Sequence, residues 1–127
     1  MSARSMSRRR TRLAMAARWL PGTVLLAETA VGAYWDLARV ATVREVLDQL
    51  GYPRYFATIL GTAKLAAIAA LLAPGYPRTK EWAYAGLVFV YGGAAASHAA
   101  AGDGPDKWAT PLVFVASALA ARELRRP

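Results

Sequence analysis

The sequence predicts an all-α fold: a four-helix transmembrane bundle with a short interfacial amphipathic helix between the first and second spans. Three observations predict it. Hydrophobic residues make up 56% of the 127 residues and charged residues only 19%, which is apolar for a chain so short that much of a soluble fold would face water. The charges gather in short clusters between long apolar runs. Arginines are concentrated ahead of the first run, as on the cytoplasmic side of membrane proteins.

Four apolar stretches are the expected spans, because a helix rises about 1.5 Å per residue and the hydrocarbon core is about 30 Å thick. They run from Trp19 to Leu37, from Tyr55 to Leu72, from Trp82 to Ala101 and from Trp108 to Ala121. The fourth has only fourteen residues, so it needs flanking residues or a locally thinner bilayer to span.

The three connections differ in composition. In the segment 43–50, valines and leucines recur at i, i+3, i+4 and i+7, which predicts a short amphipathic helix lying in the membrane interface and ended by Gly51. The segment 73–82 contains Pro74, Gly75 and Pro77 and is predicted to be non-helical. The segment 101–108 is glycine-rich, acidic and short, as a turn between antiparallel helices should be.

The distribution of lysine and arginine predicts the orientation and the domains. These residues are more numerous before the first span, in the second connection and after the fourth span than in the other two connections. The positive-inside rule then places both termini in the cytoplasm. Our expectation for the location is the inner membrane of a bacterium. We expect residues 1–18 to be a basic cytoplasmic segment, 19–121 the four-span membrane domain and 122–127 a basic cytoplasmic tail. The lipid bilayer is therefore the expected partner of the protein, and nucleic acid is not.

One lysine, Lys64, lies near the middle of the second span. A lysine at that depth costs about 2.5 to 3.5 kcal/mol, and its side chain is too far from either headgroup layer to reach it. Glu28 lies at comparable depth in the first span, so an ion pair between Glu28 and Lys64 is the expected relief. Asp36 lies closer to the outer surface and is expected to pair with Arg39 or Arg54.

A stripe of polar rings marks the third span. Tyr84, Tyr91 and His98 are spaced by seven residues, which places them on one side of a helix facing the bundle interior. Together with Asp36, they are the candidate ligand-binding residues, and Lys64 and Glu28 are the candidate catalytic residues. The alternatives are packing for the tyrosines, a structural role beside the acidic turn for His98, and a purely structural Glu28–Lys64 pair.

No motif names a cofactor. The chain has no cysteine and one histidine, so no set of metal ligands is expected, and a haem would have His98 alone as its axial donor. There is no P-loop and no GxGxxG motif in the sequence.

The sequence contains a group of short motifs: Leu50–Pro53, Gly61 with Lys64, Leu71–Pro74, Lys80–Gly86, and Ser97 and His98 with Gly102 and Asp103. Together they resemble the DoxX-like family of small four-helix membrane proteins, and the resemblance covers about residues 22–121. The resemblance implies a four-helix membrane fold. The family is named for a subunit of a membrane thiosulfate:quinone oxidoreductase, but the resemblance implies no catalytic residues for this chain. The absence of cysteine argues against a covalent sulfur carrier.

Three classes of function remain open. The first is a membrane protein that binds a lipophilic small molecule, with a quinone as one candidate, in a pocket of Lys64, Glu28, Tyr91 and His98, including as a subunit of a redox complex. The second is a stand-alone membrane enzyme that uses Lys64 or Glu28 for acid/base chemistry on an apolar substrate. The third is a structural or assembly protein without a ligand, whose partner is another membrane subunit or a second copy of the chain.

Overall fold

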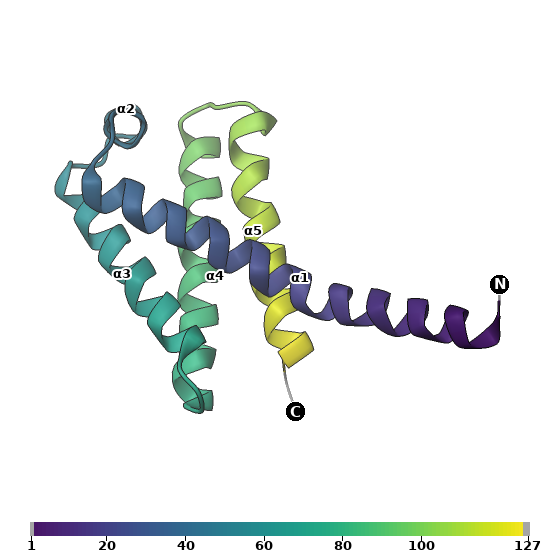
Figure 1. Ribbon diagram of the computed structural model, residues 1–127. Coiled ribbons are helices and arrows are strands. Elements are labelled where there is room, and N and C mark those ends of the chain that lie inside the picture. Colours follow the sequence, from purple (N-terminus) through teal and green to yellow (C-terminus); the bar gives the residue numbers. More distant parts are fainter. Residues whose placement is uncertain (1, 126–127) are drawn as a thin grey trace.

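The computed structural model describes residues 2–125, and the secondary-structure elements of that part of the chain are all helices (Figure 1). The helices are α1 (Ala3–Ala38), α2 (Ala41–Leu50), α3 (Tyr55–Leu72), α4 (Pro77–Ala100) and α5 (Pro105–Arg125). The prediction of an all-α fold is confirmed.

Most helix boundaries follow from local sequence signals. The α3 helix has the bounds expected for the second span, and α2 ends at Gly51, which adopts a positive φ of 82° that favours glycine. The α4 helix begins at Pro77, so the prediction that residues 73–82 are non-helical is wrong from that residue onward. Proline is favoured in the first turn of a helix because the amide that it lacks would have no partner there. The α5 helix has 21 residues, longer than the fourteen expected.

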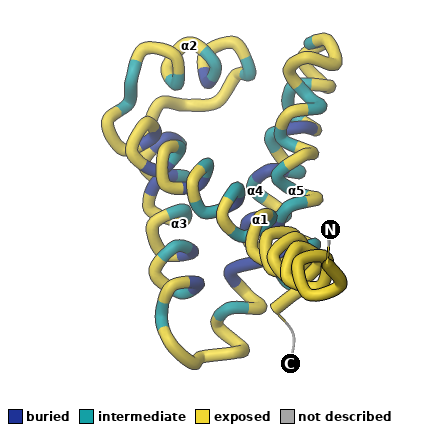
Figure 2. Tube along the Cα trace, turned by 45° about the vertical axis from the view of Figure 1, so that its right-hand side comes forward, coloured by how far each residue is buried: buried dark blue, intermediate teal, exposed yellow. Residues whose placement is uncertain are grey.

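The α1 helix has 36 residues and joins the basic N-terminal segment to the first predicted span without a break. Ser2 caps its start by accepting a hydrogen bond from the amide of Ser5 at 3.3 Å. Residues 2–20 are all exposed, and this part of α1 projects beyond the bundle (Figures 1 and 2). The helix ends at Arg39, whose φ of 48° turns the chain toward α2.

The four long helices form a ring, in which α1 and α4 each pack against both α3 and α5. The α4 and α5 helices form an antiparallel hairpin, and α1 crosses the other three obliquely (Figure 1). The core between them contains Leu25, Leu71, Tyr84, Leu87 and Tyr91, completed by small residues such as Ala118. Small residues let the helix backbones approach closely, as is common between membrane helices.

Within the described residues, α3 is the one helix long and apolar enough to cross a membrane by length and composition. Only 17% of this helix is buried inside the structure, whereas the core helix of a soluble protein would be mostly buried. The α1, α4 and α5 helices are long but less apolar, because they carry acidic or basic residues or, in α4, glycines, tyrosines and a histidine. The four-span arrangement therefore stays a prediction.

Candidate functional site

A cavity of about 540 Å³ lies among the helices at the end of the bundle where α2 is found. Every helix contributes to its walls, which are mostly apolar, and its volume is in the range typical of small-molecule sites. The apolar side of α2 forms one wall, through Val43, Val46, Leu47 and Leu50. The sequence predicted this apolar side for contact with the membrane interface, and the structure turns it toward the cavity.

The charged centre of the cavity is an ion pair between α3 and α1. The Nζ atom of Lys64 donates a hydrogen bond to Oδ2 of Asp36 at 2.8 Å. Both side chains are nearly buried, with 12% and 9% of their surfaces exposed. The lysine therefore has the buried acidic partner that its position in an apolar helix requires.

This pairing corrects the sequence-based assignment, in which Lys64 paired with Glu28 and Asp36 with Arg39 or Arg54. Arg39 instead donates to Oγ1 of Thr58 at 2.9 Å, and Arg54 lies 3.7 Å from Asp48.

Two glycines at the crossing of α1 and α3 explain the partner of Lys64. Gly61 of α3 lies so close to Leu37 that a Cβ atom there would come within 2.6 Å of the leucine Cγ and 3.1 Å of its backbone nitrogen. This contact fixes the register of the two helices. One turn further along α3, Lys64 then meets α1 at Gly32, where a Cβ atom would lie 2.9 Å from the ammonium nitrogen. Gly32 thus leaves the space through which Lys64 reaches Asp36, one turn later in α1.

Glu28 also lines the cavity and interacts electrostatically with Lys64. It is partly buried, but no hydrogen-bond donor among residues 2–125 reaches its carboxyl group. Two acidic side chains of α1 thus share one lysine, and only Asp36 is bonded to it. The Glu28 carboxyl is free to receive a hydrogen bond or a proton from a molecule in the cavity.

Tyr91 of α4 forms a further part of the cavity wall. Its hydroxyl group shares a hydrogen bond of 2.8 Å with Oγ1 of Thr29, which is fully buried in α1. Its ring packs against Phe114 of α5, with 5.3 Å between the ring centroids, and the Lys64 ammonium lies 6.0 Å from the Tyr91 ring centroid. The ring therefore faces the lysine as a cation–π partner.

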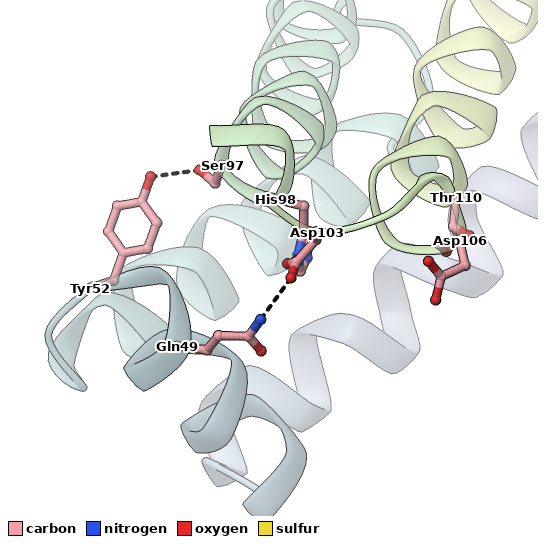
Figure 3. Close-up of polar contacts among 7 residues, drawn as sticks. All are labelled: Gln49, Tyr52, Ser97, His98, Asp103, Asp106 and Thr110. Carbon is pink, nitrogen blue, oxygen red and sulfur yellow. Dashed lines mark hydrogen bonds and ion pairs between the residues drawn. The ribbon is translucent and has the colours of Figure 1, made fainter. Parts of the chain in front are cut away.

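His98 lies where α4 meets the turn that leads to α5. Its Nδ1 atom lies 2.7 Å from Oδ2 of Asp103, and the other carboxylate oxygen of Asp103 accepts a hydrogen bond of 2.8 Å from Gln49 of α2. Nearby, the Tyr52 hydroxyl and Ser97 share a hydrogen bond of 2.7 Å (Figure 3). His98 thus lines the cavity while belonging to a polar network that ties α2 and the residues after it to the end of α4.

Tyr84 lies outside this cavity. It is a buried core residue that borders a separate small pocket with Leu25 and Leu71. Its heptad spacing from Tyr91 keeps it on the inner side of α4 but places it about 10 Å further along the helix. The heptad pattern therefore identified the buried side of α4 correctly, and it did not distinguish cavity from core.

The sequence reasoning missed Thr29, Gln49 and Tyr52. A signal was available for Thr29, because it lies seven residues before Asp36, the spacing that singled out the tyrosines of α4. Tyr52 belongs to the Leu50–Pro53 motif. Gln49 had no local signal, since its partner is 54 positions away in the sequence.

No group of three or more histidine, cysteine, aspartate or glutamate side chains in residues 2–125 is arranged to hold a metal ion. The polar groups of the cavity are one ammonium, two carboxylates, an imidazole and several hydroxyls. This set can bind carbonyl or hydroxyl groups and can exchange protons.

Comparison with known families identifies the chain. The sequence model of the DoxX-like family matches residues 22–121, which is most of the chain. The protein belongs to the DoxX-like family. No curated protein and no solved structure matches the sequence. All the cavity-lining residues of this DoxX-like protein, from Glu28 to Phe114, lie within the matched region, and the arginine-rich start of α1 lies outside it.

Proposed function

We propose that this DoxX-like protein spans the membrane with four helices: α3, α4, α5 and the part of α1 from about residue 19 onward. Large apolar side chains are left exposed on the bundle, among them Trp82 and Phe89 of α4, which are 81% and 79% exposed. The accessible surface is 8453 Å², whereas a soluble monomer of 13.6 kDa exposes about 6,600 Å². Part of this excess comes from residues 2–20, which are all exposed, and hydrocarbon around the bundle would cover the apolar side chains exposed on the other helices.

The lengths of the helices support the same proposal. With a rise of about 1.5 Å per residue, α3, α4 and α5 cover about 27 to 36 Å, close to the thickness of the hydrocarbon core. The α1 segment covers about 30 Å along its own axis, and less along the bundle because it crosses the other helices obliquely (Figure 1). The end of the bundle formed by the start of α4 and the end of α5 carries Lys80, Arg122 and Arg125, which supports a cytoplasmic position for it in our proposal. The cavity and α2 then lie toward the opposite side.

The function we propose is binding of a lipophilic small molecule in the cavity. The observation that carries it is the convergence of apolar walls on the Lys64–Asp36 ion pair in a space of about 540 Å³. Apolar walls suit a ring or an alkyl chain, and Lys64, Glu28 and His98 suit oxygen atoms at one end of it. A quinone has this chemistry and is our leading candidate. Binding a quinone would suit a subunit of a redox complex.

A second candidate function is acid/base chemistry on an apolar substrate. The Glu28 carboxyl lines the cavity beside Lys64 without a hydrogen bond from the described residues. A carboxyl group in that position can give or take a proton at a bound molecule. In the third alternative, a structural role, the Lys64–Asp36 pair only joins α3 to α1.

The test is to fill the cavity. Ala94 of α4 lines it, whereas Ala85 of the same helix is exposed and lies outside it. The wild-type protein, Ala94→Phe and Ala85→Phe are extracted mildly from membranes, and the small molecules that co-purify are identified by mass spectrometry.

We expect one lipophilic compound to accompany the wild type and Ala85→Phe and to be lost from folded Ala94→Phe. Retention of the compound by Ala94→Phe would contradict binding in the cavity. Absence of any compound from all three proteins would leave the structural role. Turnover of the identified compound by the wild type but not by Glu28→Gln would establish the enzymatic alternative.

A further inference from the structure

The exposed start of α1, residues 3–20, forms a helical arm outside the region shared with the family. We call it the arginine arm. Six of its residues are arginine: Arg4, Arg8, Arg9, Arg10, Arg12 and Arg18. No acidic residue precedes Glu28 in the sequence, so nothing within the arm neutralises this charge.

The bundle does not neutralise it either. Arg4, Arg8, Arg9, Arg10 and Arg12 form no ion pair with any residue in 2–125. At the base of the arm, Trp19 lies beside Arg125 of α5, whose guanidinium is 5.0 Å from the ring centroid of Trp19. The end of the bundle next to the arm is therefore basic as well. The arm projects away from this basic end (Figures 1 and 2), and like charge opposes its folding back.

The arm carries an apolar stripe between arginines. Successive residues of a helix are about 100° apart, so Arg4, Arg8 and Arg12 follow one side, which Met15 and Trp19 share, and Arg9 and Arg10 flank the stripe. Met6, Leu13 and Leu20 are spaced by seven residues and follow another. The exposed fractions of these three apolar side chains are 44%, 61% and 61%, which shows that the structure leaves their stripe uncovered.

The apolar stripe of the arm continues into the span that we propose for α1. Val31 lies close to the same side of the helix and is 50% exposed, on the surface that faces lipid in the proposed function. One apolar side thus extends from the span to the arm, and the arginines border it. A helix with an apolar stripe and arginines beside it lies along the surface of an anionic membrane, with the stripe at the acyl boundary and the guanidinium groups at the phosphates.

We propose that the arginine arm binds anionic phospholipid headgroups and lies in the surface of the membrane that holds the bundle. This inference rests on the membrane placement of the bundle. The arm would recognise the negative charge of lipid headgroups, and this function is separate from ligand binding in the cavity. Duplex nucleic acid is the competing polyanion.

The test uses single-cysteine labels, which are simple to place because the chain has no cysteine. The full chain carries an environment-sensitive fluorophore at one of three positions: Leu13→Cys on the apolar stripe, Thr11→Cys on the arginine side, or Leu65→Cys on the exposed surface of α3. Each protein is reconstituted into nanodiscs of phosphatidylcholine alone or with phosphatidylglycerol added. Access of the label to a neutral, water-soluble quencher is then measured.

We expect the label at position 65 to be protected in both bilayers. The label at position 13 should lose most of its access to the quencher only when phosphatidylglycerol is present, and the label at position 11 should stay accessible. Raising the salt concentration, or changing Arg8, Arg9, Arg10 and Arg12 to glutamine, should restore access at position 13, because both weaken attraction to the lipid charge.

Each contrary result has its own meaning. An accessible label at position 65 overturns the membrane placement, and the proposal for the arm with it. A protected label at position 65 with an equally accessible label at position 13 in both bilayers overturns the arm proposal alone. Protection of position 13 only on addition of duplex DNA replaces lipid by nucleic acid as the partner.

Discussion

Breaking the ion pair between Lys64 and Asp36 should destabilise the fold strongly, and restoring neutrality should rescue it. The two side chains are 12% and 9% exposed and 2.8 Å apart. Removing one member of such a pair leaves an uncompensated buried charge, which costs about 3 to 5 kcal/mol. We therefore expect Lys64→Met and Asp36→Asn each to lower the free energy of unfolding by about 3 kcal/mol. The double variant should recover all but about 1 kcal/mol, because no unpaired charge then remains.

The measurement is a double-mutant cycle by reversible unfolding in mixed detergent micelles, with a second cycle for Lys64→Met and Glu28→Gln. The structure predicts a coupling energy of several kcal/mol in the first cycle and a clearly smaller one in the second, because Glu28 interacts with the lysine electrostatically but is not hydrogen-bonded to it. If the Glu28 cycle showed the larger coupling, the register of α1 and α3 described above would be wrong. Additive effects in both cycles would show that the ion pair does not stabilise the fold.

Three further predictions concern helix packing and α2, which forms one wall of the cavity. Gly61→Ala should lower the free energy of unfolding by about 1 to 3 kcal/mol in the same assay, because the added Cβ atom would meet α1. Gly86→Ala should be neutral or stabilising, because no atom lies within 4 Å of the added Cβ. Equal effects of the two changes would contradict the close crossing of α1 and α3. Tyr91→Phe should lower the free energy of unfolding by about 1 to 3 kcal/mol, because it leaves the buried Thr29 hydroxyl without its partner. Adding Thr29→Val should recover part of this loss. A double variant no more stable than Tyr91→Phe would argue against the hydrogen bond. Gln49→Glu should place a second carboxylate beside Asp103 in the α4–α5 turn, where Gln49 now donates a hydrogen bond. Because the two carboxylates repel each other, amide hydrogen exchange should become faster in α2 but not in α3. Unchanged exchange in α2 would show that this contact does not hold the helix.

Much of the secondary structure could be predicted from the sequence, because the signals are local. The bounds of α3 follow from its apolar run, and the end of α2 follows from Gly51, whose positive φ favours glycine. The start of α4 was misjudged because Pro77 can stop a helix or begin one. The choice between these depends on the residues that follow rather than on the proline itself.

The candidate site could be predicted in part. Lys64, Glu28, Asp36, Tyr91 and His98 were singled out as polar groups in apolar helices, and all five line the cavity. Their use by a ligand is still a prediction. Tyr84 shares the heptad pattern but lies in the core, since periodicity specifies a side of a helix and not a depth along it.

By itself, the sequence determined that the chain forms apolar helices and that a lysine inside one of them must find a buried partner. That requirement follows from the cost of an unpaired charge in apolar surroundings. Only the tertiary structure decided that the partner is Asp36 and not Glu28. The choice depends on where α1 crosses α3, and this is set by the close contact of Gly61 with Leu37 and by the space that Gly32 leaves for the lysine. Contacts between residues more than twenty positions apart leave no local pattern in the sequence.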